Sequence, residues 1–205
     1  NISMMLMEKL NQQFNGRLKG AIAIFKGDCQ KKFLHQLISS QLDLDRMDYL
    51  NRDSFFTGVS EGVISFDRII KMFNVVDDQL VIEEKGIYSI ENFLISRRLM
   101  YWQVYLHKTS TSGEQLLVKI LERARELALQ GKELFATPAL QHFLAKTITE
   151  EQFFTEDIHL AQFVKLDDQD IFTAIKVWEG EADPVLSNLC RMLTTRSLYK
   201  TEISN

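Results

Sequence analysis

Helix-breaking residues are scarce in this chain, and their scarcity limits the folds that it can adopt. Two prolines and nine glycines occur among 205 residues, so long helices can run without interruption. The segments with helical spacing of hydrophobic residues are rich in leucine, methionine, glutamate, glutamine and lysine, which favour helices. With 45% hydrophobic residues, the chain also has enough apolar side chains to bury a core. We therefore expect a mainly α fold.

Two long helices and one hairpin are the clearest elements of the sequence. Residues 114–132 predict an amphipathic helix, because four apolar residues recur on one face: Leu116, Ile120, Ala124 and Leu127. Ser89 is expected to open a second long helix over residues 90–108. Within residues 74–86, two short runs of β-favouring residues flank Asp77-Asp78-Gln79, which predicts a short β-hairpin.

The second half of the chain differs in organisation from the first. Beyond Pro138 the helical segments become shorter, and each has its own start signal. Residues 197–204 alternate polar and apolar side chains, which predicts an edge strand. We therefore expect a helical body over residues 1–131 and a small C-terminal helical and α+β part over residues 132–205, joined near residues 132–137.

Composition argues against several classes of protein. A net charge of -4 gives no electrostatic reason for tight binding to a nucleic-acid backbone. Cys29 and Cys190 are far apart and form no CxxC or Cys/His pattern, so neither a disulfide framework nor a zinc site is indicated. No apolar run approaches the roughly 20 residues that a membrane helix needs. We expect reduced thiols and a cytoplasmic location.

Residues 39–59, "SSQLDLDRMDYLNRDSFFTGV", carry an unusual set of charges on a predicted helix. Asp45, Tyr49 and Asp53 are spaced by four residues and therefore lie on one side, with Arg46 beside them. Together they line a face roughly 12 Å long, which suits a polar ligand of nucleotide length. The alternative is an exposed helix with solvated charges, and spacing alone favours that alternative.

Arg97, Tyr101 and Tyr105 form a second array at four-residue intervals. An arginine suits phosphate oxygens, and a tyrosine ring can pack on a sugar or a base. The alternative places Tyr101 and Trp102 in the core and turns the arginines toward solvent. Spacing does not choose between the two.

A resemblance does. "SSQLDLDRMDYLNRDSFFTGV" and, about forty residues later, "YSIENFLISRRLMYWQVYLHKTS" resemble, in order and spacing, the later half of the dGTPase-like deoxynucleoside triphosphate triphosphohydrolases of the HD superfamily. The similarity continues through "KLDDQDIFTAIKVW" and "RSLYK". It implies a helical HD-domain-like bundle and a metal-dependent enzyme that cleaves a deoxynucleoside triphosphate to a deoxynucleoside and triphosphate.

The resemblance also implies roles for particular residues. Arg46 and Arg97 match contacts to the triphosphate. Tyr49 and Asp53 match contacts to the deoxyribose and its 3′-hydroxyl, and Tyr105 matches a tyrosine at the sugar edge that leaves little room for a 2′-hydroxyl. Guanidinium groups and a flat ring are chemically suited to these tasks.

Asp45 resembles the last ligand of the family's divalent metal, which is Mg, Mn or Fe. The family's other ligands are a histidine and a His-Asp dipeptide upstream, whereas this chain has no His-Asp dipeptide and only His35 precedes Asp45. We expect His35 to be a helix-packing or surface residue and not a metal ligand. We also expect the N-terminal region with the general acid to be absent from this chain, which would then contain no catalytic residue and hydrolyse no triphosphate alone.

The resemblance implies a deoxynucleoside triphosphate substrate, a homo-oligomer and a nucleotide effector at subunit interfaces. Two alternatives stay open at this point. The same scaffold could act on another phosphate ester, or the chain could be a non-catalytic helical module that binds a partner.

Overall fold

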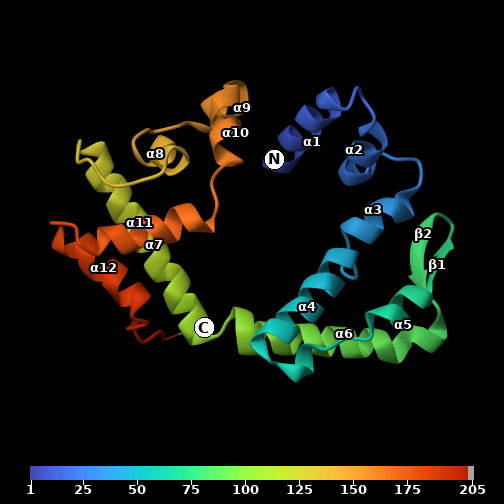
Figure 1. Cartoon of the computed structure of the whole chain (residues 1–205). Helices are drawn as coiled ribbons and strands as arrows, with labels where there is room; N and C mark the ends of the chain where they lie inside the picture. The colour runs from blue at the N-terminus through green and yellow to red at the C-terminus, as the bar shows by residue number, and fades with distance from the viewer. Residues whose placement is uncertain (203–205) are drawn as a thin grey trace. The chain divides into compact units, whose positions relative to one another are not determined.

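The computed structural model of the chain describes residues 1–202 (Figure 1). These residues form twelve α-helices and a single two-stranded antiparallel sheet, which confirms the mainly α prediction. No helix within them is long and apolar enough to cross a membrane.

Two compact units make up the chain, Asn1–His107 and Lys108–Asn205. The division lies earlier than the boundary predicted at residues 131 and 132, because the long helix α7 (Lys108–Leu129) packs against α8 (Pro138–Leu144) and α12 (Pro184–Thr194). α7 therefore belongs with the elements that follow it in the sequence.

The first unit contains helices on either side of a hairpin. Its elements are α1 (Ile2–Gln13), α2 (Lys19–Lys26), α3 (Lys32–Ile38), α4 (Leu44–Thr57), η1 (Ser60–Gly62), α5 (Phe66–Lys71), β1 (Phe73–Val76), β2 (Gln79–Ile82), η2 (Glu84–Gly86), α6 (Ile87–Met100) and η3 (Tyr101–Tyr105).

The predicted hairpin is confirmed. β1 and β2 pair antiparallel, and Val76 lies opposite Gln79 beside the turn. The two turn residues, Asp77 and Asp78, have φ angles of 49° and 61°. Two-residue hairpin turns need such left-handed backbone, and aspartate tolerates it better than most residues do. The Asp78 carboxylate also accepts a hydrogen bond of 2.8 Å from the backbone N–H of Lys32 at the start of α3.

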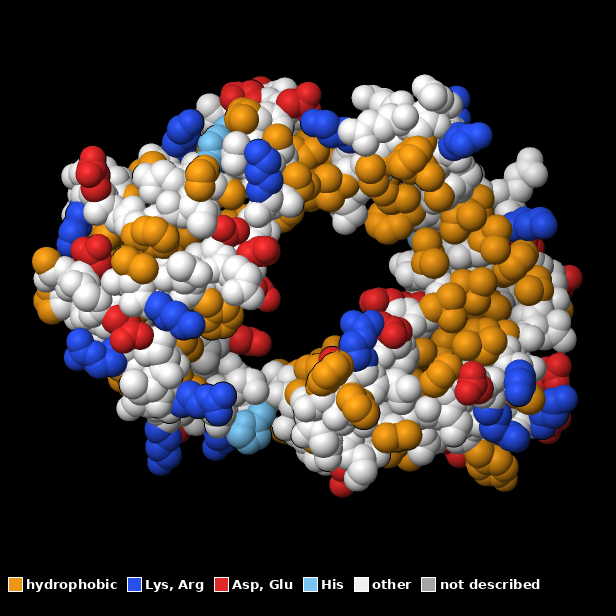
Figure 2. Space-filling model, viewed as in Figure 1, with side chains coloured by type: hydrophobic (Ala, Val, Ile, Leu, Met, Phe, Trp, Pro, Cys, Tyr) orange, Lys and Arg blue, Asp and Glu red, His pale blue; other side chains and the backbone are white. Residues whose placement is uncertain are grey.

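α4 and α6 share the buried core of the first unit. The core consists of Met47, Leu50, Ile64, Ile69, Phe93 and Met100. Between α4 and α5 the chain crosses α6 at Gly62, where an added Cβ would overlap the side chains of Met100 and Ser54. Hydrophobic side chains also remain at the surface of this unit, as Figure 2 shows over α2 and α3.

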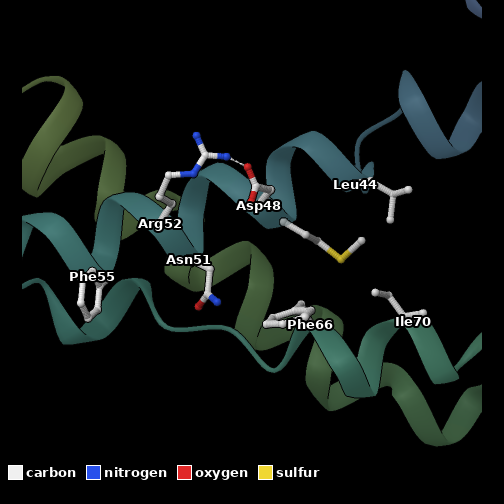
Figure 3. A pocket seen from close by; sticks show the side chains of 8 residues that line it. Leu44, Asp48, Asn51, Arg52, Phe55, Phe66 and Ile70 are labelled. Carbon is white, nitrogen blue, oxygen red and sulfur yellow. Dashed lines mark ion pairs between the residues drawn. The ribbon is translucent and has the colours of Figure 1, made fainter.

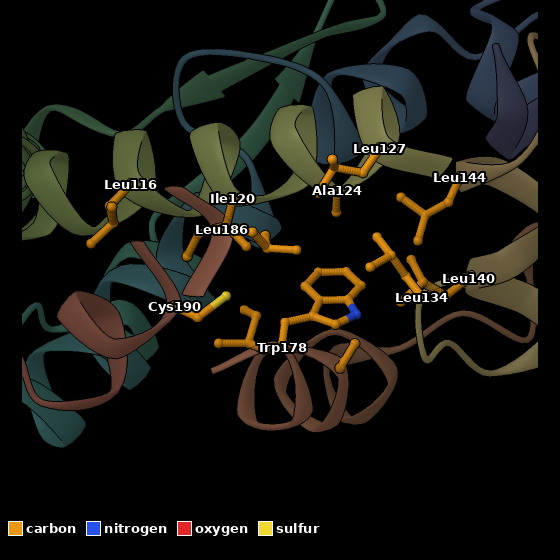
Figure 4. Close-up of a cluster of buried hydrophobic side chains, with 12 residues drawn as sticks. Leu116, Ile120, Ala124, Leu127, Leu134, Leu140, Leu144, Trp178, Leu186 and Cys190 are labelled. Carbon is orange, nitrogen blue, oxygen red and sulfur yellow. The ribbon is translucent and has the colours of Figure 1, made fainter. Parts of the chain in front are cut away.

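The second unit contains only helices among its described residues. Besides α7, α8 and α12, these are α9 (Glu150–Thr155), α10 (Asp157–Phe163) and α11 (Asp168–Trp178). Trp178 is fully buried at the centre of its core (Figure 4). Its Nε1–H donates to the carbonyl of Phe135 at 2.9 Å. The predicted apolar face of α7 lines this core through Leu116, Ile120, Ala124 and Leu127.

The predicted helix starts and the C-terminal strand are partly wrong. α6 begins at Ile87, before Ser89, and α7 begins at Lys108, before residue 114. Residues 197–202 form no strand, because the carbonyl of Tyr199 instead accepts a hydrogen bond of 2.8 Å from the Ser112 hydroxyl of α7. The remainder of the predicted strand, residues 203 and 204, lies outside the described residues.

Asp183 joins two helices of the second unit. Its side chain caps α12 by accepting from the backbone N–H of Leu186 at 2.8 Å. It also accepts two hydrogen bonds from the Arg123 guanidinium of α7, at 3.2 and 2.7 Å. The hydrogen bonds from Arg123, followed by that from Leu186, lower the pKa of Asp183 to about 2.

We expect Asp183→Ala to destabilise the chain by about 1–3 kcal/mol at neutral pH, because the substitution removes a helix cap and a charged hydrogen-bond pair. The lowered pKa makes this contribution complete above the unfolded pKa of about 3.9 and lost as the pH falls toward that of the folded state. Urea denaturation at neutral and acidic pH measures it. Asp168→Ala, an exposed first-turn residue of α11, is the control. Equal losses in both variants, or an effect of Asp183→Ala that does not shrink in acid, would contradict this role.

Candidate functional site

The first turn of α4 distinguishes the two aspartates of Asp43-Leu44-Asp45. Asp43 is only 3% exposed and caps the helix by accepting from the backbone N–H of Arg46 at 2.8 Å. Asp45 lies in the first turn with an exposed side chain. The first aspartate therefore has a structural task, and the second is available to a ligand.

Arg46 is held beside this cap. Its guanidinium forms an ion pair with the Asp43 carboxylate and donates to the carbonyl of Ser40. Arg46 is therefore half-buried and already partnered by an anion, unlike the solvated pair that Asp48 and Arg52 form on the exposed surface of the same helix.

Asp53 and Tyr105 join α4 to η3, the turn that follows α6. The Tyr105 hydroxyl donates to the Asp53 carboxylate at 2.6 Å. Burial raises the pKa of Tyr105 well above its ordinary value, and the hydrogen bond to Asp53 raises it further. The ring of Tyr49 meets the ring of Tyr105 edge to face, with centroids 6.1 Å apart. Two rings and a carboxylate thus form one half-buried surface.

A π-helical turn carries Tyr105. η3 follows α6 directly, and the backbone N–H of Leu106 donates to the carbonyl of Tyr101, five residues earlier, at 2.7 Å. Such wide turns are rare and occur frequently at functional sites. The ring of Tyr101 lies 5.2 Å from that of Tyr105, so the turn groups both tyrosines.

Arg97 extends the same surface. Its guanidinium lies 5.8 Å from the centroid of the Tyr101 ring and donates to the Gln41 side chain at 3.2 Å. Burial raises the pKa of Tyr49, whereas the charges of Arg97 and Arg46 lower it. Both guanidinium groups therefore lie close enough to act on the same phenol.

The structure brings together most of the predicted site. Five of its six residues lie together: the rings of Tyr49 and Tyr105, the carboxylate of Asp53, and the guanidinium groups of Arg46 and Arg97 near Tyr49. Asp45 lies one turn of α4 before Tyr49. Tyr101 and Trp102 are exposed, so the alternative that placed them in the core is wrong. Sequence reasoning missed Gln41 and the capping role of Asp43, since neither follows a helical repeat with the other residues.

The described residues do not complete a metal site around Asp45. No group of three or more His, Cys, Asp or Glu side chains within residues 1–202 is placed to hold an ion. His35 Nδ1 donates to the carbonyl of Ile24 at 2.9 Å, as expected for a packing residue. In the second unit, His142 and His159 bind one another through nitrogens 2.8 Å apart.

A separate pocket of about 410 Å³ lies on another face of α4 (Figure 3). Its wall combines hydrophobic side chains of α4 and α5 with the Asp48–Arg52 ion pair: Leu44, Met47, Asp48, Asn51, Arg52, Phe55, Phe66 and Ile70. None of the six predicted site residues lines this pocket.

Comparison with known proteins finds a family region that is similar to the last part of the first unit and the beginning of the second. Residues 64–143 match an HD associated region. The region includes Arg97 and Tyr105 but begins after α4, so the family match does not extend to Asp45 or Asp53.

Three relatives extend the comparison. A phosphohydrolase from Bacteroides thetaiotaomicron, known from a crystal structure, is 58% identical to this chain in sequence. The two structures match with a TM-score of 0.96, over 98% of this chain and 50% of that one. An uncharacterized protein of Bacillus subtilis, YwfO, is 40% identical over 83% of this chain and 37% of its own length. The deoxynucleoside triphosphate triphosphohydrolase SAMHD1 homolog of Dictyostelium discoideum is 30% identical over 46% of this chain and 19% of its own length. The chain thus spans half or less of each of these relatives.

The raised pKa of Tyr105 predicts a phenol that stays neutral where a free tyrosine ionises, at about pH 10. Asp53→Asn removes the negative acceptor, so the pKa of Tyr105 should fall, although burial would keep it raised. A phenolate absorbance titration measures this, with Tyr105→Phe identifying the signal. Asp67→Asn, an exposed carboxylate of α5, is the control. An unchanged titration in Asp53→Asn would show that the hydrogen bond does not act on Tyr105.

Proposed function

We propose that this chain is the substrate-binding part of an HD-type, metal-dependent phosphohydrolase that cleaves a deoxynucleoside triphosphate to a deoxynucleoside and triphosphate. The observation that carries the proposal is the Tyr105–Asp53 hydrogen bond, which fixes a ring and a carboxylate next to Tyr49, the phenol on which the charges of Arg46 and Arg97 both act. The match to an HD associated region and the similarity to a phosphohydrolase support the reaction class. The similarity to the Dictyostelium deoxynucleoside triphosphate triphosphohydrolase SAMHD1 homolog supports the substrate class.

Arg46 and Arg97 would bind the triphosphate. They approach the Tyr49 ring from different elements, α4 and α6, so a chain of phosphates could lie between them. Guanidinium groups donate to phosphate oxygens in a planar fork and stay charged at any physiological pH. Offsetting the charge that develops on a triphosphate leaving group is a principal way for an enzyme to speed such a reaction.

Tyr105 and Asp53 would select the sugar. One oxygen of the Asp53 carboxylate accepts from the Tyr105 hydroxyl, and the other could accept from a sugar 3′-hydroxyl. Because the hydroxyl is bonded to Asp53, the Tyr105 ring cannot turn away to admit an additional 2′-hydroxyl without losing that bond. This arrangement favours deoxyribose over ribose.

The metal-dependent step lies outside the described residues. Asp45 is their one predicted ligand, and no surrounding group completes a site. We therefore assign substrate binding to this chain and the hydrolytic step to a longer protein that contains it, as the relatives' lengths allow. The 205 residues alone should release no triphosphate from dGTP, and turnover by the purified chain would contradict this assignment.

We expect the chain to bind dGTP, and Arg97→Ala to weaken binding by about 10- to 100-fold, because a charged hydrogen bond contributes roughly 1.5–3 kcal/mol. Isothermal titration calorimetry measures the affinities. Arg52→Ala is the matched control, since it also removes one guanidinium from the first unit but lies on another face of α4. Tyr105→Ala should reduce the preference for dGTP over GTP. Equal loss in the Arg97 and Arg52 variants would indicate non-specific attraction of an anion.

In a longer protein that contains these residues, Asp45→Ala should abolish both triphosphate release and bound metal, because a carboxylate ligand is removed. Asp48→Ala, three residues further along α4 and exposed like Asp45, should preserve both. Triphosphate release and metal content by mass spectrometry are the two measurements. Unchanged activity and metal content in Asp45→Ala would instead favour a non-catalytic helical module.

A further inference from the structure

The loop that precedes α4 is fixed by its own hydrogen bonds. We call residues 40–43 the support loop. The backbone N–H of Ser40 donates to the Asp43 carboxylate at 3.3 Å, and the backbone N–H of Leu42 donates to the Ser40 hydroxyl at 3.2 Å. Asp43 is buried, and Leu42 packs against the core of the first unit. Gln41 therefore lies between two residues whose positions are fixed.

The support loop contacts two arginines that come from different helices. The carbonyl of Ser40 accepts a hydrogen bond from the Arg46 guanidinium of α4. The next residue, Gln41, accepts with its side-chain Oε1 from Nη1 of Arg97 in α6, at 3.2 Å. Neighbouring residues of one loop thus bind both guanidinium groups that act on the Tyr49 phenol.

The contacts of Arg97 leave its charge in place. An ion pair, such as that of Arg46 with Asp43, orients a guanidinium but also opposes its charge. Both contacts of Arg97 described above, the Gln41 amide and the Tyr101 ring, are neutral. A neutral acceptor orients a guanidinium and leaves its positive charge to attract an anion.

We propose that Gln41 is a positioning residue for the triphosphate, which holds the Arg97 guanidinium in place through its Oε1 atom without opposing its charge. The inference rests on the proposed function, because it requires a phosphate group at Arg97. A side chain that is ordered before binding loses less conformational entropy when the ligand arrives, which strengthens binding. A guanidinium has five N–H groups, so one bond from Nη1 to Gln41 leaves others for phosphate oxygens.

The alternative role for Gln41 is a structural tie between the support loop and α6. The bond between Gln41 and Arg97 lies at the exposed surface. Substitutions at such sites usually change the free energy of unfolding very little. A positioning residue should therefore affect nucleotide affinity through Arg97 while the stability of the chain stays the same.

A double-mutant cycle between Gln41 and Arg97 separates the two roles. Gln41→Leu removes the acceptor and should weaken dGTP binding by about 3- to 10-fold, the effect of one hydrogen bond. In the Arg97→Ala background, Gln41→Leu should have no further effect, because the group that it positions is gone. Gln41→Glu keeps an acceptor but adds a negative charge, so it should weaken binding at least as much as Gln41→Leu.

Isothermal titration calorimetry of the whole chain measures the affinities, and urea denaturation checks the stability of each variant. Gln79→Leu is the matched control. Gln79 is another exposed glutamine of the first unit, and its Oε1 accepts from the Gln36 side chain at 2.8 Å instead of from an arginine. Gln79→Leu should bind dGTP like the wild type.

A loss in Gln41→Leu that disappears in the Arg97→Ala background supports the positioning role. If Arg97→Ala weakens binding but Gln41→Leu does not, the positioning role is overturned and the proposed function stands. Equal losses from Gln41→Leu in both backgrounds also overturn the positioning role, since Gln41 would then act through another group. A wild-type chain that does not bind dGTP, or an Arg97→Ala variant that binds it equally well, overturns the proposed function itself and this inference with it.

Discussion

The packing of α4 against α6 is the contact on which the first unit depends. Leu50 and Phe93 are both fully buried where the two helices share a core. Because a helix side chain is fixed by its position round the axis, this contact also decides which side chains meet at the edge of the core. Asp53 and Tyr105 are more than fifty residues apart in sequence, and their hydrogen bond forms only because α4 and α6 are held together.

Local features of the fold could be predicted from the sequence. The hairpin followed from Asp77 and Asp78 between two β-favouring runs, and the inner face of α7 followed from its apolar repeat. Boundaries that depend on distant contacts could not be predicted in this way. α7 belongs to the second unit because it packs against α12, which begins more than fifty residues after α7 ends. The expected strand after residue 196 failed because a side chain of α7 already binds the backbone of Tyr199.

Spacing in the sequence predicted only part of the candidate site, and the reason differs from that for the fold. Spacing placed Asp45, Tyr49 and Asp53 on one side of a helix, but it could not show that the other array lies beside them. The resemblance supplied that pairing, and the structure brings the two arrays together through Tyr105. Gln41 and the π-helical turn had no sequence signal, since one lies before the helix and the other is a backbone distortion that no repeat of side chains predicts.

The cap of α4 has a consequence for any anion that approaches Arg46. The Asp43 carboxylate already occupies part of the guanidinium and is itself only 3% exposed. A ligand that took Arg46 away would leave a buried negative charge without its counter-ion, which is costly. An incoming phosphate must therefore share Arg46 with Asp43, and the electrostatic gain from this arginine is smaller than from an unpaired one. In return the guanidinium is already oriented before the ligand arrives, because Asp43 and the carbonyl of Ser40 hold it in one direction.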